Sequence, residues 1–385
     1  MTNHIPRTPP GSTPPDAAPI RPVPIRDTPP NAEIHPEMLP QEVTPNEGYF
    51  VRCNFDVPGL DARAHRIEVG GAVRRSIGFG TSELAAMEHR TLEVTTECAG
   101  NGRLGMQPPV DGEPWNDHAV STAVWKGVPL RALLEAAEVE DGAVEVRFDG
   151  ADGGEKAGVQ GRIGYQRSLP LARALDPDTL VALEMNGRPL PPEHGAPVRL
   201  VVPGWYGMAS VKWLRRIEVL TEPFTGYFQR DRYVYDPGDG SVPTPVTTMR
   251  VRSLLHTPRS GAVVPPGPLQ VRGWAWSGDG AITRVEVALD GGGDWSEATL
   301  ESRPDAPHAW VGWSCTVDVE TPGRHFLRSR AVDSAGHRQP DRPPWNRLGY
   351  GQNAVRTVIF QVGDGGSPGR RGEEGGGVHA SDDRS

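Results

Sequence analysis

The chain has 385 residues, a formal net charge of −9, 40 prolines and 47 glycines. A single hydrophobic core seldom grows beyond about 250–300 residues, so this length predicts at least two domains. The acidic balance, without any block of Lys and Arg, argues against a protein that binds nucleic acid through its phosphates.

The N-terminal segment, residues 1–44, is dense in proline and poor in aromatic residues. Such a segment buries too little apolar surface to offset the entropy lost on ordering, so we predict that it is disordered. It shows neither the apolar stretch of a secretory signal nor a twin-arginine motif, and the chain has no run of about 18 apolar residues. We therefore expect a cytoplasmic protein that does not enter a membrane.

Residues 45–248 are predicted to form a first domain that mixes strands with short helices. One helix is expected over residues 81–89, which open with Thr and Ser, and another over residues 128–139, where apolar residues recur on one face. Because strands and helices do not alternate regularly, the pattern is typical of an α+β fold. The predicted strands span residues 65–73, 90–97, 143–150, 179–190, 197–204 and 211–220.

The end of this domain, residues 223–248, is rich in Pro, Gly and Asp, and we expect it to cross the surface as a connection. From residue 249 on, helix signals stop and short alternating strands follow one another. Residues 249–362 are therefore predicted to form an immunoglobulin-like β-sandwich. The Gly-rich residues 363–385 are expected to be disordered.

The three cysteines, Cys53, Cys98 and Cys315, are far apart and fit neither a disulfide framework nor a zinc site. Cys98 differs from the others because it follows a predicted strand within the motif ECAGNGR, residues 97–103. The two glycines of the motif would let a ligand approach the sulfur, and Arg103 would favour a thiolate. A buried cysteine that only packs is the competing interpretation.

Two further segments carry clustered polar residues. The first is YFVRCNF, which brings Arg52 and Asn54 between aromatic residues. The second, residues 185–219, carries His194, Arg199 and Lys212 around loops rich in Gly and Pro. Taken singly, each side chain is typical of an exposed polar residue. Taken together and in this order, they indicate a binding site.

These motifs resemble those of the sulfite oxidase family of molybdenum enzymes over about residues 45–362. ECAGNGR is similar to the family's Cys-Ala-Gly-Asn motif, and YFVRCNF to its Phe-x-Arg-Asn-His segment. MNGRPLPPEHGAPVRLVVPG and VKWLRRIEV are similar to its cofactor-binding loops, and residues 272–295 and 331–355 to its immunoglobulin-like dimerisation domain. The resemblance implies a molybdopterin oxidoreductase that forms a homodimer through its C-terminal domain.

The resemblance also implies roles for single residues. Cys98 would bind molybdenum, which needs one soft protein ligand besides the two sulfurs of the pterin. Arg52, Arg103 and Tyr233 would be the catalytic residues, with Tyr235 as the alternative tyrosine in YFQRDRYVYD. The residues expected to hold the molybdopterin are Phe50, Val51, Arg52, Asn54, Cys98, Asp152, His194, Arg199, Ser210, Val211 and Lys212.

Three positions depart from the family pattern. Asn54 stands where a histidine is usual, and Trp313 and Ala209 stand where arginines are expected. The loss of two positive charges would weaken the binding of a doubly charged anion.

We therefore expect oxygen-atom transfer between water and a small sulfur oxyanion such as sulfite, or a related oxo acceptor. An oxo-reductase of a sulfoxide-like substrate and a non-catalytic molybdopterin-binding protein are the alternatives. Neither a cytochrome b5 pattern nor a Cys-x-x-Cys-His haem motif occurs in the sequence. We thus expect no haem, and a separate carrier that accepts or supplies electrons.

Overall fold

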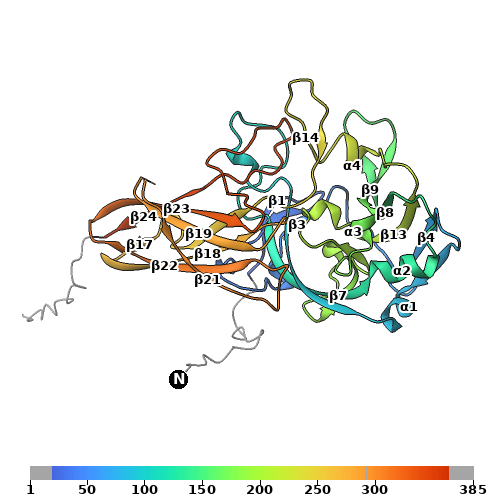
Figure 1. The fold of residues 1–385 in the computed structure, drawn as a ribbon. Helices are drawn as coiled ribbons and strands as arrows, with labels where there is room; N and C mark the ends of the chain where they lie inside the picture. Colours follow the sequence, from blue (N-terminus) through green and yellow to red (C-terminus); the bar gives the residue numbers. More distant parts are fainter. Residues whose placement is uncertain (1–19, 292, 364–385) are drawn as a thin grey trace, which may run out of the picture.

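The computed structural model describes residues 20–291 and 293–363, which form two lobes side by side (Figure 1). The first lobe mixes sheets with short helices, and the second is built from strands. The α-helices in the described residues are α1 (Thr81–Ala86), α2 (Leu130–Ala137), α3 (Leu171–Ala174) and α4 (Tyr227–Arg230). The 3-10 helices are η1 (Pro36–Met38), η2 (Asn46–Gly48), η3 (Arg103–Gly105), η4 (Pro192–His194) and η5 (Gly207–Ala209).

Three larger sheets and a two-stranded one build the first lobe in the described residues. The smallest of the three has the order β1-β2-β3, with β1 (Val23–Arg26), β2 (Asn31–Glu33) and β3 (Val51–Arg52). The second sheet has the order β11-β10-β7-β6, and β12 also pairs with β10. Its strands are β6 (Arg90–Glu97), β7 (Val120–Pro129), β10 (Leu180–Met185), β11 (Arg188–Pro189) and β12 (Arg199–Val201). The third has the order β5-β4-β13-β8-β9: β4 (Arg66–Gly71), β5 (Ile77–Gly80), β8 (Glu145–Glu155), β9 (Arg162–Pro170) and β13 (Leu214–Leu220).

Helix α2 shows why this lobe follows the sequence pattern. It begins directly after Pro129, and its apolar face, Leu130, Leu133, Leu134 and Ala137, is fully buried. That face packs against β4 and β7, so the helix gains its stability from tertiary burial more than from its short length. The helix expected over 81–89 is confirmed as the shorter α1, and the mixture of strands and helices is confirmed, with strands in the majority.

The predicted disorder of residues 1–44 is wrong for residues 20–44, whereas residues 1–19 lie outside the described part of the chain. Strands β1 and β2 pair with each other, and β2 pairs with β3. Ile34 and Leu39 are buried in the main core of the first lobe. A few apolar residues between the prolines are therefore enough to fix the segment, because other parts of the chain supply the surface that they cover.

The second lobe consists of two sheets that enclose one apolar core. One sheet has the order β16-β18-β22-β21: β16 (Arg252–Thr257), β18 (Gly267–Trp276), β21 (Thr299–Glu301) and β22 (Val311–Val319). The other has the order β17-β24-β23-β19-β20: β17 (Val263–Val264), β19 (Ile282–Leu289), β20 (Ser296–Glu297), β23 (Gly323–Asp333) and β24 (Thr357–Val362). The predicted tail lies outside the described residues, apart from residue 363.

Residues 223–248, expected to be a surface connection, contribute to the core instead. They contain α4 and the strand pair β14 (Val234–Tyr235) and β15 (Thr244–Pro245). Phe228, Tyr233 and Val246 are buried in the core of the first lobe. The Pro, Gly and Asp residues form the turns, and the few aromatic residues between them point inward.

Tryptophans of the second lobe fasten it to the first. Trp274 and Trp310 donate hydrogen bonds to main-chain oxygens of the N-terminal segment, over 2.5 and 2.9 Å. The indole of Trp276 donates to the carboxylate of Glu97 over 2.9 Å. Because Glu97 directly precedes Cys98 in the chain, this contact couples the second lobe to the predicted metal ligand.

A buried ion network strengthens the same junction. Arg252 at the start of β16 donates to Glu97 over 2.9 Å and also to Asp117, and Arg356 donates to Asp117 over 3.0 Å. Arg252 and Glu97 have side chains only 1% and 2% exposed. Burial raises the pKa of Glu97, and the charge of Arg252 opposes that rise. The pair therefore needs both members to remain stable inside the protein.

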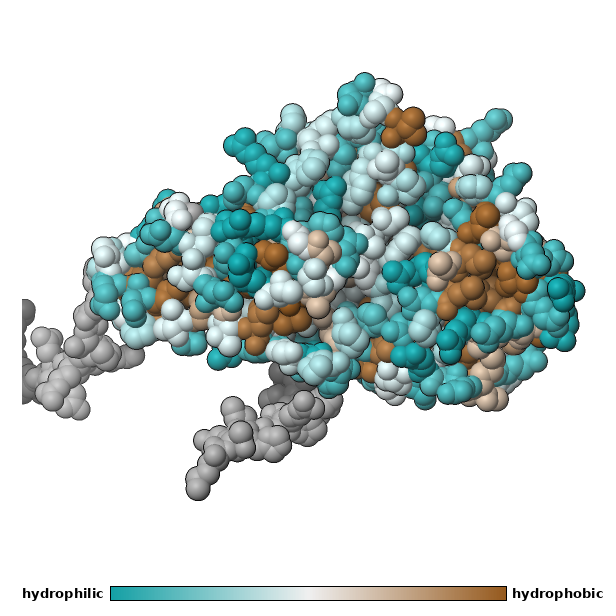
Figure 2. All heavy atoms as spheres, viewed as in Figure 1, coloured by the Kyte–Doolittle hydropathy of each residue, from teal (hydrophilic) through white to brown (hydrophobic). Residues whose placement is uncertain are grey.

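The surface seen in Figure 2 is mostly hydrophilic, with apolar side chains gathered over the lobe that carries α2 and over the second lobe. Val144, Leu175, Phe326 and Ile359 are among the large apolar residues that remain exposed. Apolar surface on this scale is ordinary for a folded protein. Among the described residues, no helix has the length and hydropathy needed to span a bilayer.

Candidate active site

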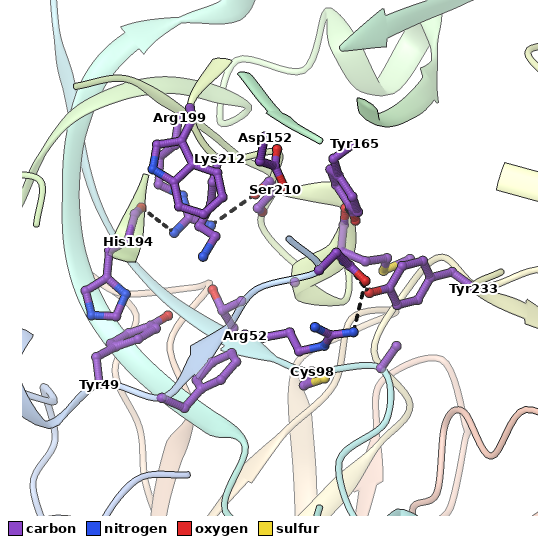
Figure 3. Close-up of a pocket in the computed structure, with 17 residues that line it drawn as sticks. Tyr49, Arg52, Cys98, Asp152, Tyr165, His194, Arg199, Ser210, Lys212 and Tyr233 are labelled. Atoms are coloured by element: carbon purple, nitrogen blue, oxygen red, sulfur yellow. Dashed lines mark hydrogen bonds between the residues drawn. The ribbon is translucent and has the colours of Figure 1, made fainter. Parts of the chain in front are cut away.

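A cavity in the first lobe collects most of the predicted site residues (Figure 3). Its walls carry aromatic side chains together with cationic, hydroxyl, amide, thiol and carboxyl groups. Strand β3, the chain after β6 and the loop from η4 to β13 surround it. The residues that line it are Tyr49, Phe50, Arg52, Asn54, Thr96, Cys98, Ala99, Asp152, Tyr165, His194, Arg199, Gly207, Met208, Ser210, Lys212, Trp213 and Tyr233.

Cys98 lies in the turn after β6 and is held there by its main chain. Its N–H donates to the carbonyl of Ala119 over 2.9 Å, and its carbonyl accepts from the N–H of Asn101 over 2.8 Å. A Cβ at Gly100 would lie 2.6 Å from the guanidinium of Arg103, so a larger residue there would displace that side chain. Cys98 is 6% exposed and belongs to an apolar cluster of the core, and it also lines the cavity.

The environment of Cys98 favours the neutral thiol while no metal is bound. Burial raises the pKa of the thiol, and the charge of Arg52 opposes that effect only in part. Arg103 favours the thiolate, as expected from the sequence, but less strongly than Arg52, and burial outweighs both charges. A metal ion deprotonates a coordinating thiol, so metal binding would supply the stabilisation that the protein alone does not.

Arg52, Asn54 and Tyr233 form a hydrogen-bonded chain beside Cys98 (Figure 3). Arg52 Nη2 donates to Asn54 Oδ1 over 2.9 Å, and Asn54 Nδ2 donates to the Tyr233 hydroxyl over 3.0 Å. Tyr233 has a φ of 52°, in the left-handed region that bulky residues seldom adopt. The structure thus brings Tyr233 to the cavity, whereas Tyr235 is not among the lining residues.

The other end of the cavity is basic. Arg199 donates to the main-chain oxygens of His194 and Ser210 over 2.9 and 3.1 Å, and Lys212 Nζ donates to Cys53 Sγ over 3.0 Å. Within the described residues, no carboxylate forms a hydrogen bond or ion pair with either cation. Burial lowers the pKa of Arg199 to about 10 and also lowers that of Lys212. Burial and these two charges lower the pKa of His194 to about 3, so its ring is neutral.

Asp152 on β8 provides the acidic side chain among the lining residues. It is 6% exposed, and its Oδ1 has no hydrogen-bond partner in the described part of the chain. Burial raises its pKa to about 6, and the charge of Lys212 opposes that rise. A buried acceptor without a donor is costly, so this oxygen is suited to receive an N–H group of a bound molecule.

Three of the predicted site residues do not line the cavity. Val51 packs in a small cluster beside it, and Val211 is fully buried in the main core. Arg103 lies behind the wall, where it donates to the carbonyl of Glu113 over 2.8 Å and stacks 5.2 Å above the ring of Tyr350. Arg103 can therefore act on a ligand only through its neighbours in this conformation.

The position assigned to one missing arginine is also wrong. Trp313 is 1% exposed and lies in the core between the two sheets of the second lobe. A side chain there could not reach the cavity. Ala209 is buried in the core of the first lobe, next to the lining residues Met208 and Ser210.

Sequence reasoning missed several lining residues. Tyr49 and Trp213 directly flank motif residues, so their position in the chain was an available signal. Tyr165 on β9 carried none, because only the pairing of β9 with β8 brings it to the cavity. The remaining lining residues not predicted are Thr96, Ala99, Gly207 and Met208.

Comparison with protein families yields two matches that together cover both lobes. Residues 54–228 match the oxidoreductase molybdopterin binding domain. Residues 244–362 match the Mo-co oxidoreductase dimerisation domain. The cavity described above thus lies largely within the molybdopterin-binding match.

Whole-chain comparison gives the same result. The chain is 39% identical to the sulfite oxidase of Gallus gallus over 343 residues, which cover 83% of this chain and 74% of that protein. It is 37% identical to the mitochondrial sulfite oxidase of Mus musculus over 356 residues, 87% of this chain and 64% of that protein. An NADH nitrate reductase of Solanum lycopersicum is 34% identical over 359 residues, although the match covers only 38% of that longer protein.

A solved structure shows that the similarity extends to the fold. The sulfane dehydrogenase SoxCD from Paracoccus pantotrophus superposes with a TM-score of 0.71 at 30% identity, over 83% of each chain. The motifs, the family matches and this superposition agree with one another. The chain therefore belongs to the sulfite oxidase family of molybdopterin-dependent oxidoreductases.

Proposed function

We propose that the chain transfers an oxygen atom to a small sulfur oxyanion such as sulfite, with Cys98 as the protein ligand of the molybdenum. The observation that carries this proposal is the position of Cys98 on the wall of the cavity that Arg52 and Tyr233 also line. A single cysteine is sufficient because the pterin supplies the other sulfur ligands.

The free hydrogen-bonding groups of the cavity support a molybdenum–molybdopterin cofactor. Arg199 and Lys212 have main-chain and thiol partners but no carboxylate, so their charge suits a phosphate. The unpaired Oδ1 of Asp152 suits the N–H edge of a pterin ring. Cys98 supplies the soft ligand that the metal requires. The site therefore fits the cofactor in charge and in donor and acceptor pattern.

When bound, the cofactor supplies the oxygen-atom and electron chemistry of the reaction. The contribution of the chain is to bind and orient the substrate. Arg52 lies beside Cys98 and would attract an anion, and the Tyr233 hydroxyl would donate to one of its oxygens or pass a proton. Asn54 holds that hydroxyl in place through its own hydrogen bond.

The remaining parts of the proposal concern assembly. The two sheets around one core support an immunoglobulin-like sandwich for the second lobe, and the dimerisation-domain match supports a homodimer through it. The residue ranges 45–248 and 249–362 are the proposed domains. We also propose a separate electron carrier and no haem in this chain, and the cytoplasmic location stays a prediction.

Metal analysis of a cysteine variant tests the assignment. Wild-type protein should hold about one molybdenum per chain, as expected for one thiolate site, and Cys98→Ser should hold almost none. Cys315→Ser is the matched control, because Cys315 lies on a strand of the second lobe and should leave the metal content unchanged. Molybdenum retained in Cys98→Ser would overturn the role of this sulfur.

Turnover then tests the reaction. Sulfite-dependent reduction of an artificial electron acceptor by the wild-type holoenzyme supports the proposal. An oxo-reductase of a sulfoxide-like substrate is the second candidate. It is favoured because Arg103 donates to main-chain oxygens of Glu113 and Leu348 and does not face the cavity, and a neutral substrate needs less positive charge. In that case a sulfoxide would oxidise a reduced dye in the presence of the enzyme, and sulfite would leave the acceptor oxidised.

A further inference from the structure

Arg167 is a buried cation without a counter-ion. It lies on β9, is 1% exposed, and donates to the main-chain oxygens of Phe228 and Val246, the latter over 3.3 Å. Its Nε has no partner, and within residues 20–291 and 293–363 no carboxylate pairs with it. The acidic group that acts on it is Glu145, whose carboxylate accepts from the N–H of Phe224 instead.

The charge of Arg167 lies directly behind the cavity. Its guanidinium is 5.8 Å from the ring centre of Tyr233, which lines the cavity. The ring of Tyr233 also packs with its centre 5.2 Å from that of Tyr350, and the guanidinium of Arg103 lies 5.2 Å from the ring centre of Tyr350. The two tyrosine rings thus pack together, and a guanidinium lies over each of them. Arg167 lies over Tyr233, and Arg103 lies over Tyr350.

An unpaired buried charge costs free energy, and its field is not cancelled by a neighbouring carboxylate. Burial lowers the pKa of Arg167, as expected for such an ion, but an arginine stays protonated at neutral pH. In a medium with an effective dielectric constant of about 20, a unit charge acting over about 9 Å changes the affinity for a monoanion by about tenfold or more. The ring of Tyr233 separates this charge from the cavity without screening it as water would.

We propose that Arg167 is a specificity residue of this site, whose charge behind Tyr233 makes the cavity prefer an anionic substrate over a neutral one. The inference deepens the proposed function and rests on it, because it concerns the substrate of the same cavity. The charge of Arg167 would add positive potential to a cavity that Arg103 does not line. Arg167 acts through Tyr233 and touches no substrate, so it is a positioning and electrostatic residue.

Equilibrium binding of sulfate to the holoenzyme tests this without turnover. We expect Arg167→Gln, which loses the charge but keeps an N–H donor, to bind sulfate about tenfold or more weakly than wild type. Arg167→Lys keeps the charge and should bind within about threefold of wild type, a rescue that a purely structural role would not give. Arg162→Gln, an exposed arginine on the same strand, is the matched control and should bind as wild type does.

Steady-state kinetics give a second measurement. In Arg167→Gln the KM for sulfite should rise by a similar factor while kcat changes little, and the molybdenum content should stay as in wild type. If Arg167→Gln does not fold, Arg167→Met removes the same charge with an apolar side chain of similar length, which buried sites often tolerate.

Equal sulfate affinity in wild type and Arg167→Gln would overturn the inference, as would a wild type that does not bind sulfate. The inference would also be overturned if Arg167→Lys bound sulfate as weakly as Arg167→Gln. The loss of affinity would then follow from altered packing and not from the lost charge. A holoenzyme that binds sulfate through Arg167 but leaves sulfite unoxidised would refute the proposed function and leave this inference standing.

Discussion

The side-chain amide of Asn54 donates a hydrogen bond to the hydroxyl of Tyr233 across 3.0 Å, although the two residues are 179 positions apart. The same asparagine accepts from Arg52, so one amide orients both groups next to Cys98. Asn54 can do this because its amide both donates and accepts. The side chain of Asn54 therefore joins the segment of Arg52 to that of Tyr233, and its geometry fixes the direction of the tyrosine hydroxyl.

We predict that Tyr233→Phe lowers kcat/KM for sulfite by about 100-fold or more, because a positioned hydroxyl that donates to substrate or passes a proton is lost. The phenyl ring should keep its packing, so molybdenum content should not change. Steady-state kinetics and metal analysis of the same preparation check this. Tyr235→Phe is the control, since Tyr235 stacks on Arg250 away from the cavity lining, and a similar loss in that variant would contradict the choice of Tyr233.

Asp152 should make the cofactor-free protein less stable as the pH rises. Burial raises the pKa of Asp152 to about 6 from an ordinary value of 3.8. Between these values the folded state keeps a proton that the unfolded chain has released, so the free energy of unfolding falls with increasing pH, and the loss is complete above about pH 6.

The variant Asp152→Asn removes this titration. We expect the cofactor-free variant to be more stable than wild type by about 1–3 kcal/mol at about pH 8, with little difference at about pH 4. It should also hold less cofactor, because the variant loses the negative charge and one of the two acceptor oxygens of the carboxylate. Urea denaturation at the two pH values measures the stability, and an equal difference at both would show that Asp152 is not the titrating group.

Breaking the ion network at the junction of the lobes should be strongly destabilising, because it leaves a buried charge uncompensated. Arg252→Met leaves Glu97 and Asp117 without their buried cation, and we expect a loss of about 3–5 kcal/mol in the free energy of unfolding. Arg338→Met is the control: Arg338 is 48% exposed in its ion pair with Glu286, and such pairs contribute at most about 1 kcal/mol. Urea denaturation measures the free energy of unfolding of both variants. If both lose a similar amount, burial of the network does not make it more important for stability than an exposed ion pair.

The N-terminal segment should behave as part of the core. Ile34 is fully buried, so Ile34→Ala should cost about 2–5 kcal/mol of stability. Ile20, with 36% exposure, is the matched control, and Ile20→Ala should change stability by no more than about 0.5 kcal/mol. Thermal denaturation of both variants measures these changes. An Ile34→Ala variant as stable as wild type would mean that the segment contributes no packing.

Local patterns in the sequence were enough to predict α2 and the strands before and after it. They also predicted that Cys98 lies in a turn after a strand. These features depend on periodicity and on glycines within a few residues, which act at short range. The motif order likewise pointed to the molybdopterin site, because Arg52, Asp152, His194 and Lys212 all lie in segments with their own signal. Residues 20–44 were misjudged because their apolar residues are few, and the surface that buries them lies elsewhere in the chain.

Only the tertiary structure decided which polar groups meet and which stay unpaired. Arg103 and Tyr233 were both expected at the substrate, yet main-chain oxygens hold Arg103 behind the wall while the strained backbone of Tyr233 turns it into the cavity. Arg167 gave no sign in the sequence, because whether a charge is compensated depends on groups brought together from distant strands and loops. Sequence alone thus determined the family and the metal-binding sulfur expected of it, whereas long-range packing determined the electric field around that sulfur.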